Sequence, residues 1–182
     1  EEVMRIISGI AKGHTLKAPK GVTTRPTLDR VRESIFNVVA NYGIPGKRIL
    51  DLFSGTGAMA LEALSRGASH AIAVDRVTKP LIVENAKHCH LEDRLHVVSC
   101  SLARVSQFLE GQQFDYIFSD PPYEKNYINA TIEMVVGCNI LALDGMLILE
   151  RHEKEIPILP EDWVCIKEQK FGYTMVSYCV KK

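Results

Sequence analysis

The chain has 182 residues, of which 46% are apolar and 24% are charged, and its formal net charge is zero. These values are typical of one globular domain with a buried core, and they exclude an intrinsically disordered chain. No run of about 18 apolar residues occurs and the start lacks the layout of a signal peptide, so the sequence predicts a cytoplasmic protein without a membrane span.

The N-terminal stretch is basic. Residues 4–32 hold seven Lys or Arg side chains against a single acid. A basic arm on a neutral body indicates an anionic partner, although a solvated surface explains the charge alone equally well. Residues 5–20 are predicted to form short strands or a hairpin. A helix is expected next, with Thr27 as its N-cap and an apolar stripe that extends to Tyr42.

From residue 46 onward, strand and helix patterns alternate. Strands are expected at 48–53, 70–75, 95–99, 114–120 and 145–151, and helices at 58–67, 77–89, 101–111 and 127–140. The alternation predicts an α/β fold with a doubly wound, Rossmann-like, mostly parallel sheet and helices on both of its faces. Residues 163–182 predict an antiparallel hairpin at the C-terminal edge, joined at Phe171-Gly172. We therefore divide the chain into an N-terminal extension, 1–45, and a main domain, 46–182.

Two glycines, Gly55 and Gly57, lie between the first predicted strand and its helix. In open α/β sheets, ligands bind at this end of the strands, where glycines allow close approach and the helix N-terminus offers free N–H groups. Asp75 ends the second strand 20 residues after Gly55, where a carboxylate accepts hydrogen bonds from ribose hydroxyls. The turn is therefore predicted to bind a nucleotide-like cofactor. A helix cap is the structural alternative for Asp75.

Two cofactors fit this turn, and Asp51 distinguishes between them. Gly55, Gly57 and Ala60 match the dinucleotide pattern G-x-G-x-x-A, so NAD is one candidate. However, Asp51 lies four residues before Gly55, and a carboxylate there would repel a pyrophosphate. S-adenosylmethionine has an ammonium group, a sulfonium and a ribose but no phosphate, so methyl transfer is favoured over hydride transfer. A strand-end turn cap is the structural alternative for Asp51.

The fourth predicted strand ends in Asp120-Pro121-Pro122-Tyr123. An exocyclic or amide nitrogen is a poor nucleophile because its lone pair is delocalised, so it must be turned toward the methyl donor. Asp120 can accept a hydrogen bond from one N–H and the carbonyl of Pro121 from the other, while the two prolines fix the backbone. Tyr123 offers a ring that can stack on a flat base, worth about 1–3 kcal/mol. These four residues are the candidate catalytic group, with an ordinary turn as the alternative.

The cysteines and histidines indicate no metal site. Five cysteines are scattered without a Cys-x-x-Cys pair, which is typical of buried free thiols in a reducing compartment. The six histidines show no metal-ligand spacing, so we expect no metal.

The chain resembles the RsmD family in the stretches RPTLDRVRESIFN, ILDLFSGTGAMALEALSRGA, DPPY and FGYTMVSY. Many amino-methylating enzymes share the Asp-Pro-Pro-Tyr corner, and the Arg-Pro-Thr helix narrows the resemblance to this family. The resemblance implies a seven-stranded class I methyltransferase sheet with an N-terminal extension that bears a hairpin. It implies transfer of a methyl group from S-adenosylmethionine to the N2 amine of a guanine in 16S ribosomal RNA, leaving S-adenosylhomocysteine. We expect the protein to be a monomer. The implied substrate is an assembled or partly assembled small ribosomal subunit.

The resemblance also implies roles for single residues. Asp120 to Tyr123 would hold the guanine amine, and Asp75 the ribose. Methyltransferases of this class often carry an Asp where this chain has Ser101, so Ser101 or the backbone at Leu102 would bind the adenine. The cofactor-binding candidates are Asp51, Phe53, Gly55, Gly57, Asp75, Arg76, Ser101 and Leu102. The RNA-binding candidates, on the basic arm and near the mouth of the site, are Lys12, Lys17, Arg25, Thr27 and Arg30.

Two other functions stay open from the sequence. The same chemistry can act on DNA adenine or protein glutamine, but the Arg-Pro-Thr helix and the lack of a separate sequence-reading domain disfavour this. A non-catalytic RNA-binding assembly factor can keep the fold, but the intact Asp-Pro-Pro-Tyr corner argues against it. Zero net charge is unusual for an RNA-binding protein, so either the basic arm docks the RNA or ribosomal proteins contribute to recognition.

Overall fold

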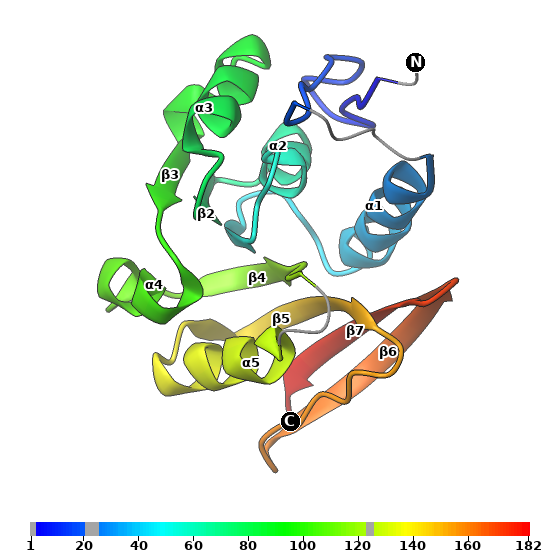
Figure 1. Cartoon of the computed structure of the whole chain (residues 1–182), viewed down its shortest axis with the longest axis vertical. Helices are drawn as coiled ribbons and strands as arrows, with labels where there is room; N and C mark the ends of the chain where they lie inside the picture. Colours follow the sequence, from blue (N-terminus) through cyan, green and yellow to red (C-terminus); the bar gives the residue numbers. More distant parts are fainter. Residues whose placement is uncertain (1–2, 21–25, 123–125) are drawn as a thin grey trace. The chain divides into compact units, whose positions relative to one another are not determined.

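The computed structural model describes residues 3–20, 26–122 and 126–182, with residues 26–28 described by their backbone alone (Figure 1). The chain divides into two compact units, Glu1–Ser99 and Cys100–Lys182. Both units combine strands with helices, as the alternating sequence pattern predicts. Among the described helices, none is long and apolar enough to cross a membrane.

Unit 1 begins with an irregular segment rather than with regular strands. Its two arms meet at one antiparallel bridge between Arg5 and Thr15. The backbone N–H of Ile6 donates to the carbonyl of His14 at 3.0 Å, and that of Leu16 to the carbonyl of Met4 at 2.8 Å. The predicted hairpin is therefore present only as a bridged loop over the described residues 3–20, which we call the N-terminal segment.

The helix α1, Pro26–Ala40, follows. It starts at Pro26, so Thr27 lies inside the first turn and the predicted N-cap position is wrong by one residue or more. The apolar stripe is confirmed at Val31, Ile35 and Val39, which are at most 4% exposed. Tyr42 lies beyond the helix end and is 55% exposed, so its predicted place in the stripe is wrong.

The sheet of unit 1 is parallel, in the order β3-β2-β1. Its strands are β1 (Arg48–Leu52), β2 (His70–Asp75) and β3 (Leu95–Ser99), and its further helices are α2 (Ala58–Ser65), α3 (Lys79–His88) and a short 3₁₀ turn, η1 (Glu92–Arg94). The register pairs Asp51 with Ala73 and Leu52 with Val74. The carboxyl ends of β1 and β2 therefore lie side by side, as the nucleotide-type site requires.

Two buried polar side chains of α2 hold the N-terminal segment against that helix. The carboxylate of Glu62, which is fully buried, accepts hydrogen bonds from the backbone N–H groups of Ile7 at 2.8 Å and Ser8 at 3.1 Å. Ser65, one helical turn later, donates its hydroxyl to the carbonyl of Ser8 at 2.6 Å and accepts the N–H of Ala11 at 2.9 Å. Side chains thus satisfy the backbone groups that a regular hairpin would pair with each other.

Unit 2 has a mixed sheet in the order β4-β5-β7-β6. Its elements are α4 (Leu102–Leu109), β4 (Phe114–Ser119), α5 (Tyr127–Gly137), β5 (Leu141–His152), β6 (Trp163–Phe171) and β7 (Thr174–Lys181). β4 and β5 are parallel, whereas β7 runs antiparallel to both β5 and β6. The predicted α/β class, with a mostly parallel sheet and an antiparallel C-terminal edge, is confirmed.

Three details of unit 2 differ from the sequence prediction. β5 begins at Leu141, four residues early, because α5 already ends at Gly137. The C-terminal hairpin turns at Gly172 and Tyr173, since Phe171 pairs with Thr174. The last strand, β7, lies inside the sheet and β6 forms the edge. The prediction of buried thiols holds only in part for three cysteines next to or within the strands. Cys179 is buried, whereas Cys100 and Cys165 are only half-buried.

Replacing Gly9 by alanine should destabilise the protein more than the same change at Gly13. Both glycines have a positive φ, +91° and +85°, so both alanines bear the cost of the left-handed conformation, about 1–2 kcal/mol. A Cβ at Gly9 would lie 1.9 Å from the carbonyl oxygen of Ser65, whereas one at Gly13 would meet nothing within 4 Å. Urea unfolding should therefore show the larger loss of unfolding free energy for Gly9→Ala. Equal losses would contradict the tight contact of the N-terminal segment with α2.

Candidate functional site

The turn between β1 and α2 has an unusual backbone. Phe53, directly after β1, has φ +56°, although it is not a glycine, and Gly55 and Gly57 have φ +60° and +85°. Gly57 occupies the N-cap position of α2. A positive φ at a bulky residue costs free energy and persists only where the surroundings hold it, often at functional sites. We call Phe53–Gly57 the glycine turn.

Asp51 supports this turn from inside β1. Its side chain is 2% exposed, and Oδ2 accepts hydrogen bonds from the hydroxyl of Ser54 at 2.6 Å and from the backbone N–H of Ala60 at 3.1 Å. The structural alternative raised from the sequence, a cap of the turn, is therefore part of its role. Asp51 also places a buried carboxylate at the end of β1, where it favours a cationic ligand group over a phosphate.

Asp75 reaches the same turn from the end of β2. Its Oδ2 accepts the backbone N–H of Gly55 at 2.9 Å, and its Oδ1 accepts those of Val77 at 2.8 Å and Thr78 at 3.0 Å. Asp75 thus holds both the turn that leads into α3 and the glycine turn, while Thr78 is the N-cap residue of α3. A carboxylate can accept about four hydrogen bonds, so these three leave room for about one ribose hydroxyl. The next candidate, Arg76, is exposed.

The remaining cofactor candidates lie in unit 2. Ser101 is the N-cap residue of α4, with an extended backbone, and Leu102 is the first residue of that helix. Both are half-buried. Within the described residues, the hydroxyl of Ser101 makes no capping hydrogen bond to α4. Its donor and acceptor are therefore not used by the helix.

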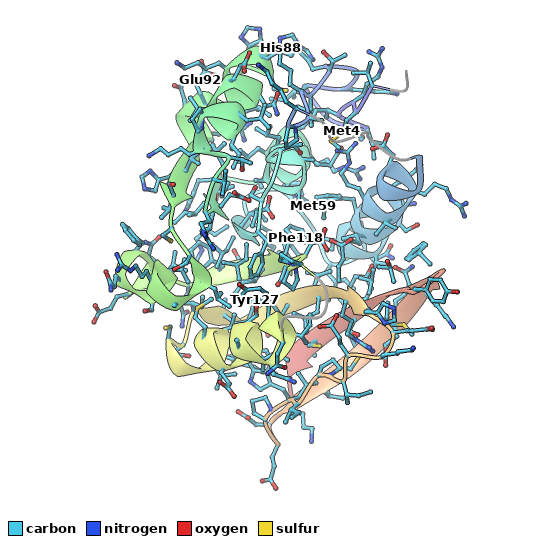
Figure 2. The ribbon with its side chains drawn as sticks, in the orientation of Figure 1. Met4, Met59, His88, Glu92, Phe118 and Tyr127 are labelled. Carbon is cyan, nitrogen blue, oxygen red and sulfur yellow. The ribbon has the colours of Figure 1, made fainter. Side chains whose placement is uncertain are left out.

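The Asp-Pro-Pro corner follows β4 in unit 2, between Phe118 and Tyr127 in the chain, both of which are labelled in Figure 2. Asp120 and Pro122 are exposed, whereas Pro121 between them is buried and anchors the corner. Tyr123, the fourth member of the predicted catalytic group, lies outside the described residues.

The carboxyl of Asp120 has an altered acidity. Burial of the Asp120 carboxyl raises its pKa from 3.8 to about 6, because a carboxylate that has lost part of its hydration is costly to ionise. The residue as a whole nevertheless keeps exposed surface. This combination suits a hydrogen-bond acceptor that can also receive a proton near neutral pH.

The RNA-binding candidates fall into three groups. Lys12 and Arg30 are exposed. Lys17 is exposed as well, but its Nζ lies 2.5 Å from Oε1 of Glu84 on α3, so a phosphate would have to compete with that carboxylate. Arg25 and the side chain of Thr27 lie outside the described residues.

One residue of the basic stretch serves the core instead of a surface. Arg32 is 4% exposed, and its Nε lies 3.8 Å from Oε1 of the buried Glu62. Burial lowers the pKa of its guanidinium, while the charges of Glu62 and Asp29 oppose that shift. The stretch of residues 4–32 therefore presents fewer positive charges to an anionic partner than its count of Lys and Arg residues indicates.

Sequence reasoning missed Asn85 on α3. Its side chain is 1% exposed and contacts both the N-terminal segment at Lys17 and the glycine turn at Thr56. The signal was present in the sequence, since Asn85 falls on the helix face whose other members are apolar. The buried members of that face are Ile82, Asn85, Ala86 and Cys89.

The structure brings together the cofactor candidates of unit 1 around one turn. The hydrogen bonds given above join the turn to Asp51 at Ser54 and to Asp75 at Gly55. Ser101, Leu102 and the Asp-Pro-Pro corner belong to unit 2. Among the described residues, no group of three or more His, Cys, Asp or Glu side chains is arranged to hold a metal ion.

Comparisons with known proteins cover the whole chain. The model of the family described as conserved hypothetical protein 95 matches residues 4–180. A Bacillus subtilis protein provisionally named rRNA methyltransferase YlbH is 38% identical over 98% of this chain and 100% of its own length. Ribosomal RNA small subunit methyltransferase D of Escherichia coli is 33% identical over 93% of this chain and 85% of its own. The solved structure of E. coli yhhF, provisionally described as a methyltransferase, has a TM-score of 0.86 at 31% identity and covers 100% of this chain and 99% of that one.

The raised pKa of Asp120 predicts that replacing this residue changes the stability of the protein in a pH-dependent way. Because the folded pKa of about 6 exceeds the ordinary value of 3.8, folding favours the protonated carboxyl. This contribution is complete below about pH 4 and is lost as the pH rises through about 6. Asp120→Asn should therefore melt at a higher temperature than the unchanged protein at about pH 8, and the difference should vanish toward about pH 4.

Differential scanning calorimetry across this pH range provides the measurement. Asp144→Asn is the matched control, because Asp144 is an exposed carboxylate of β5 in the same unit. A difference for Asp120→Asn that stays constant with pH would contradict the raised pKa.

Proposed function

The chain belongs to the family described as conserved hypothetical protein 95, and from this premise we propose that it is an S-adenosylmethionine-dependent methyltransferase acting on the N2 amine of a guanine in 16S ribosomal RNA. Membership confirms the resemblance to the RsmD family. The observation that carries the reaction type is Asp120, an exposed residue whose carboxyl has a raised pKa, directly after β4 and next to the buried Pro121.

The residues of unit 1 fit the cofactor. S-adenosylmethionine, when bound, supplies a methyl group made electrophilic by its sulfonium. The buried carboxylate of Asp51 would attract the ammonium end, and the remaining acceptor position of Asp75 would take one ribose hydroxyl. The backbone of Gly55 and Gly57 would allow close approach, because no side chain intervenes. Phe53, whose strained backbone belongs to this turn, would also contact the cofactor.

Two further candidates, Ser101 and Leu102, are proposed for the adenine of the cofactor. The hydroxyl of Ser101, which does not cap α4, and the backbone at Leu102 would bind the adenine. Arg76 follows Asp75 directly in the chain and would contact the same cofactor.

The corner after β4 would orient the guanine amine. Asp120 would accept a hydrogen bond from one N–H and the carbonyl of Pro121 from the other, which turns the nitrogen lone pair toward the methyl carbon. Transfer breaks the carbon–sulfur bond and forms the carbon–nitrogen bond, leaving S-adenosylhomocysteine. The amine then loses one proton, for which Asp120 is an acceptor. Pro122 would stiffen the corner and Tyr123 would stack on the base.

The protein would act on RNA as a monomer. The extension 1–45 would dock on RNA phosphates, and the main domain 46–182 would perform the transfer. The docking residues would be Lys12, Lys17, Arg25, Thr27 and Arg30. An assembled or partly assembled small subunit is the proposed substrate, because a chain with zero net charge gains from further contacts to ribosomal proteins.

Transfer of a radioactive methyl group from labelled cofactor to small subunits that lack the modification tests the proposal. We expect label in the RNA as N2-methylguanine. Label on DNA adenine or on protein glutamine would support the other amino methyltransferases. Binding of the subunit without any transfer would identify an assembly factor instead.

Replacing Asp120 should separate catalysis from cofactor binding. Asp120→Ala should lower the single-turnover rate at least about 100-fold, because the amine loses its orienting acceptor, and should leave the cofactor affinity nearly unchanged. Asp120→Asn keeps an acceptor oxygen but cannot take a proton, so an intermediate rate would show that orientation is the main role. Asp75→Ala is the contrast, since it should weaken cofactor binding first. Loss of cofactor binding in Asp120→Ala would mean that the role is misassigned.

Lys12→Ala should weaken RNA binding more at low salt than at high salt. A lysine that neutralises one phosphate releases about one counterion, so its removal should reduce the slope of log affinity against log salt by about one. Lys17→Ala should have a smaller effect, because Glu84 already pairs with that lysine. Filter binding across a salt series measures both. A loss independent of salt would indicate a structural role for the lysine.

A further inference from the structure

Asn85 joins two parts of unit 1 that are far apart in the sequence. Its Oδ1 accepts the backbone N–H of Lys17 at 2.9 Å, and its Nδ2 donates to the carbonyl of the same residue at 3.0 Å. The same Nδ2 donates to the carbonyl of Thr56 at 2.9 Å. One buried amide on α3 therefore holds the N-terminal segment and the glycine turn together.

A second contact joins the same two parts. The hydroxyl of Thr56 lies 3.7 Å from the sulfur of Met4 and is directed to it as a donor, and the carbonyl of Met4 accepts the N–H of Leu16. Figure 2 labels Met4 in the N-terminal segment. Thr56, between the two glycines of the turn, thus contacts the segment directly through Met4 and indirectly through Asn85.

The glycine turn needs such support. Its positive φ at Phe53, a residue with a bulky side chain, costs free energy that neighbouring groups must offset. Asp51 and Asp75 hold it from the strands. Asn85 adds a support from α3, and the same amide group is hydrogen-bonded to Lys17.

We propose that Asn85 is a positioning residue that couples RNA docking on the N-terminal segment to cofactor binding at the glycine turn. The inference rests on the proposed function, because it takes the turn as the cofactor site and Lys17 as an RNA contact. RNA at Lys17 stabilises the backbone that Asn85 grips, and through the carbonyl of Thr56 it stabilises the cofactor-competent turn. By linkage, the cofactor then raises the RNA affinity by the same factor.

The test measures that factor with S-adenosylhomocysteine, which binds without reacting. Isothermal titration calorimetry gives its dissociation constant for the protein alone and for the protein saturated with small subunits that lack the modification. The ratio of the two constants is the coupling factor. For the unchanged protein we expect a coupling factor of at least about 5, within the ordinary range of coupling between sites.

Asn85→Leu removes both sets of hydrogen bonds at similar volume. We expect the affinity of the free protein for S-adenosylhomocysteine to fall about tenfold and the coupling factor to fall to about 1. A merely structural role would lower the melting temperature and leave the coupling factor of the folded protein unchanged, which would overturn the proposal.

Asn129→Leu is the matched control. Asn129, on α5 in unit 2, makes a similar clamp, accepting the N–H of Ile158 at 2.8 Å and donating to the carbonyl of Ile156 at 3.2 Å. Its loss should leave the coupling factor as in the unchanged protein. If Asn85→Leu fails to fold, Asn85→Ala removes the same hydrogen bonds but leaves room for water to reach the freed backbone groups of Lys17 and Thr56. It should also lower the coupling factor to about 1, and an unchanged factor there would overturn the proposal.

The failures of the two proposals look different. If the unchanged protein binds no S-adenosylhomocysteine, the proposed function fails. If it binds both ligands with a coupling factor of 1, the proposed function stands and only the role of Asn85 is wrong.

Discussion

The glycine turn keeps its strained backbone because three side chains reach it from three different elements. Asp51 comes from β1, Asp75 from β2 and Asn85 from α3, and together they bind backbone or hydroxyl groups at Ser54, Gly55, Thr56 and Ala60. A positive φ at Phe53 would relax without such partners. The parallel register of β1 and β2 is what aligns the two carboxylates with the turn.

This arrangement matches the demands of methyl transfer. The reaction proceeds by a single displacement, so the protein contributes mainly position, alignment and charge rather than a covalent intermediate. Groups held by several hydrogen bonds lose little freedom when a ligand arrives, which makes alignment inexpensive. At Asp120 the raised pKa adds a second property, because a carboxyl that is still mostly ionised at neutral pH accepts a proton more readily than an ordinary aspartate does.

The N-terminal segment shows how a nearly irregular stretch becomes part of a folded unit. Glu62 is fully buried, yet its charge faces Arg32 and Arg66 and accepts two backbone N–H groups. A buried charge with several partners specifies one arrangement, because removing any partner leaves a costly unpaired group. The segment that carries candidate RNA contacts is thereby attached to the helix that follows the glycine turn.

Local patterns were sufficient for most of the architecture and for part of the site. Alternating strand and helix signals located β1 to β5 and the C-terminal hairpin, and residue spacing identified Gly55, Gly57, Asp51 and Asp75, because these signals depend on neighbours within about 20 residues. Long-range contacts settled the rest. The loop in place of a hairpin, the burial of Arg32 and the two contacts of Asn85 each depend on partners about 30 to 70 positions away in the chain. Only the folded backbone brings those partners within hydrogen-bond or ion-pair distance.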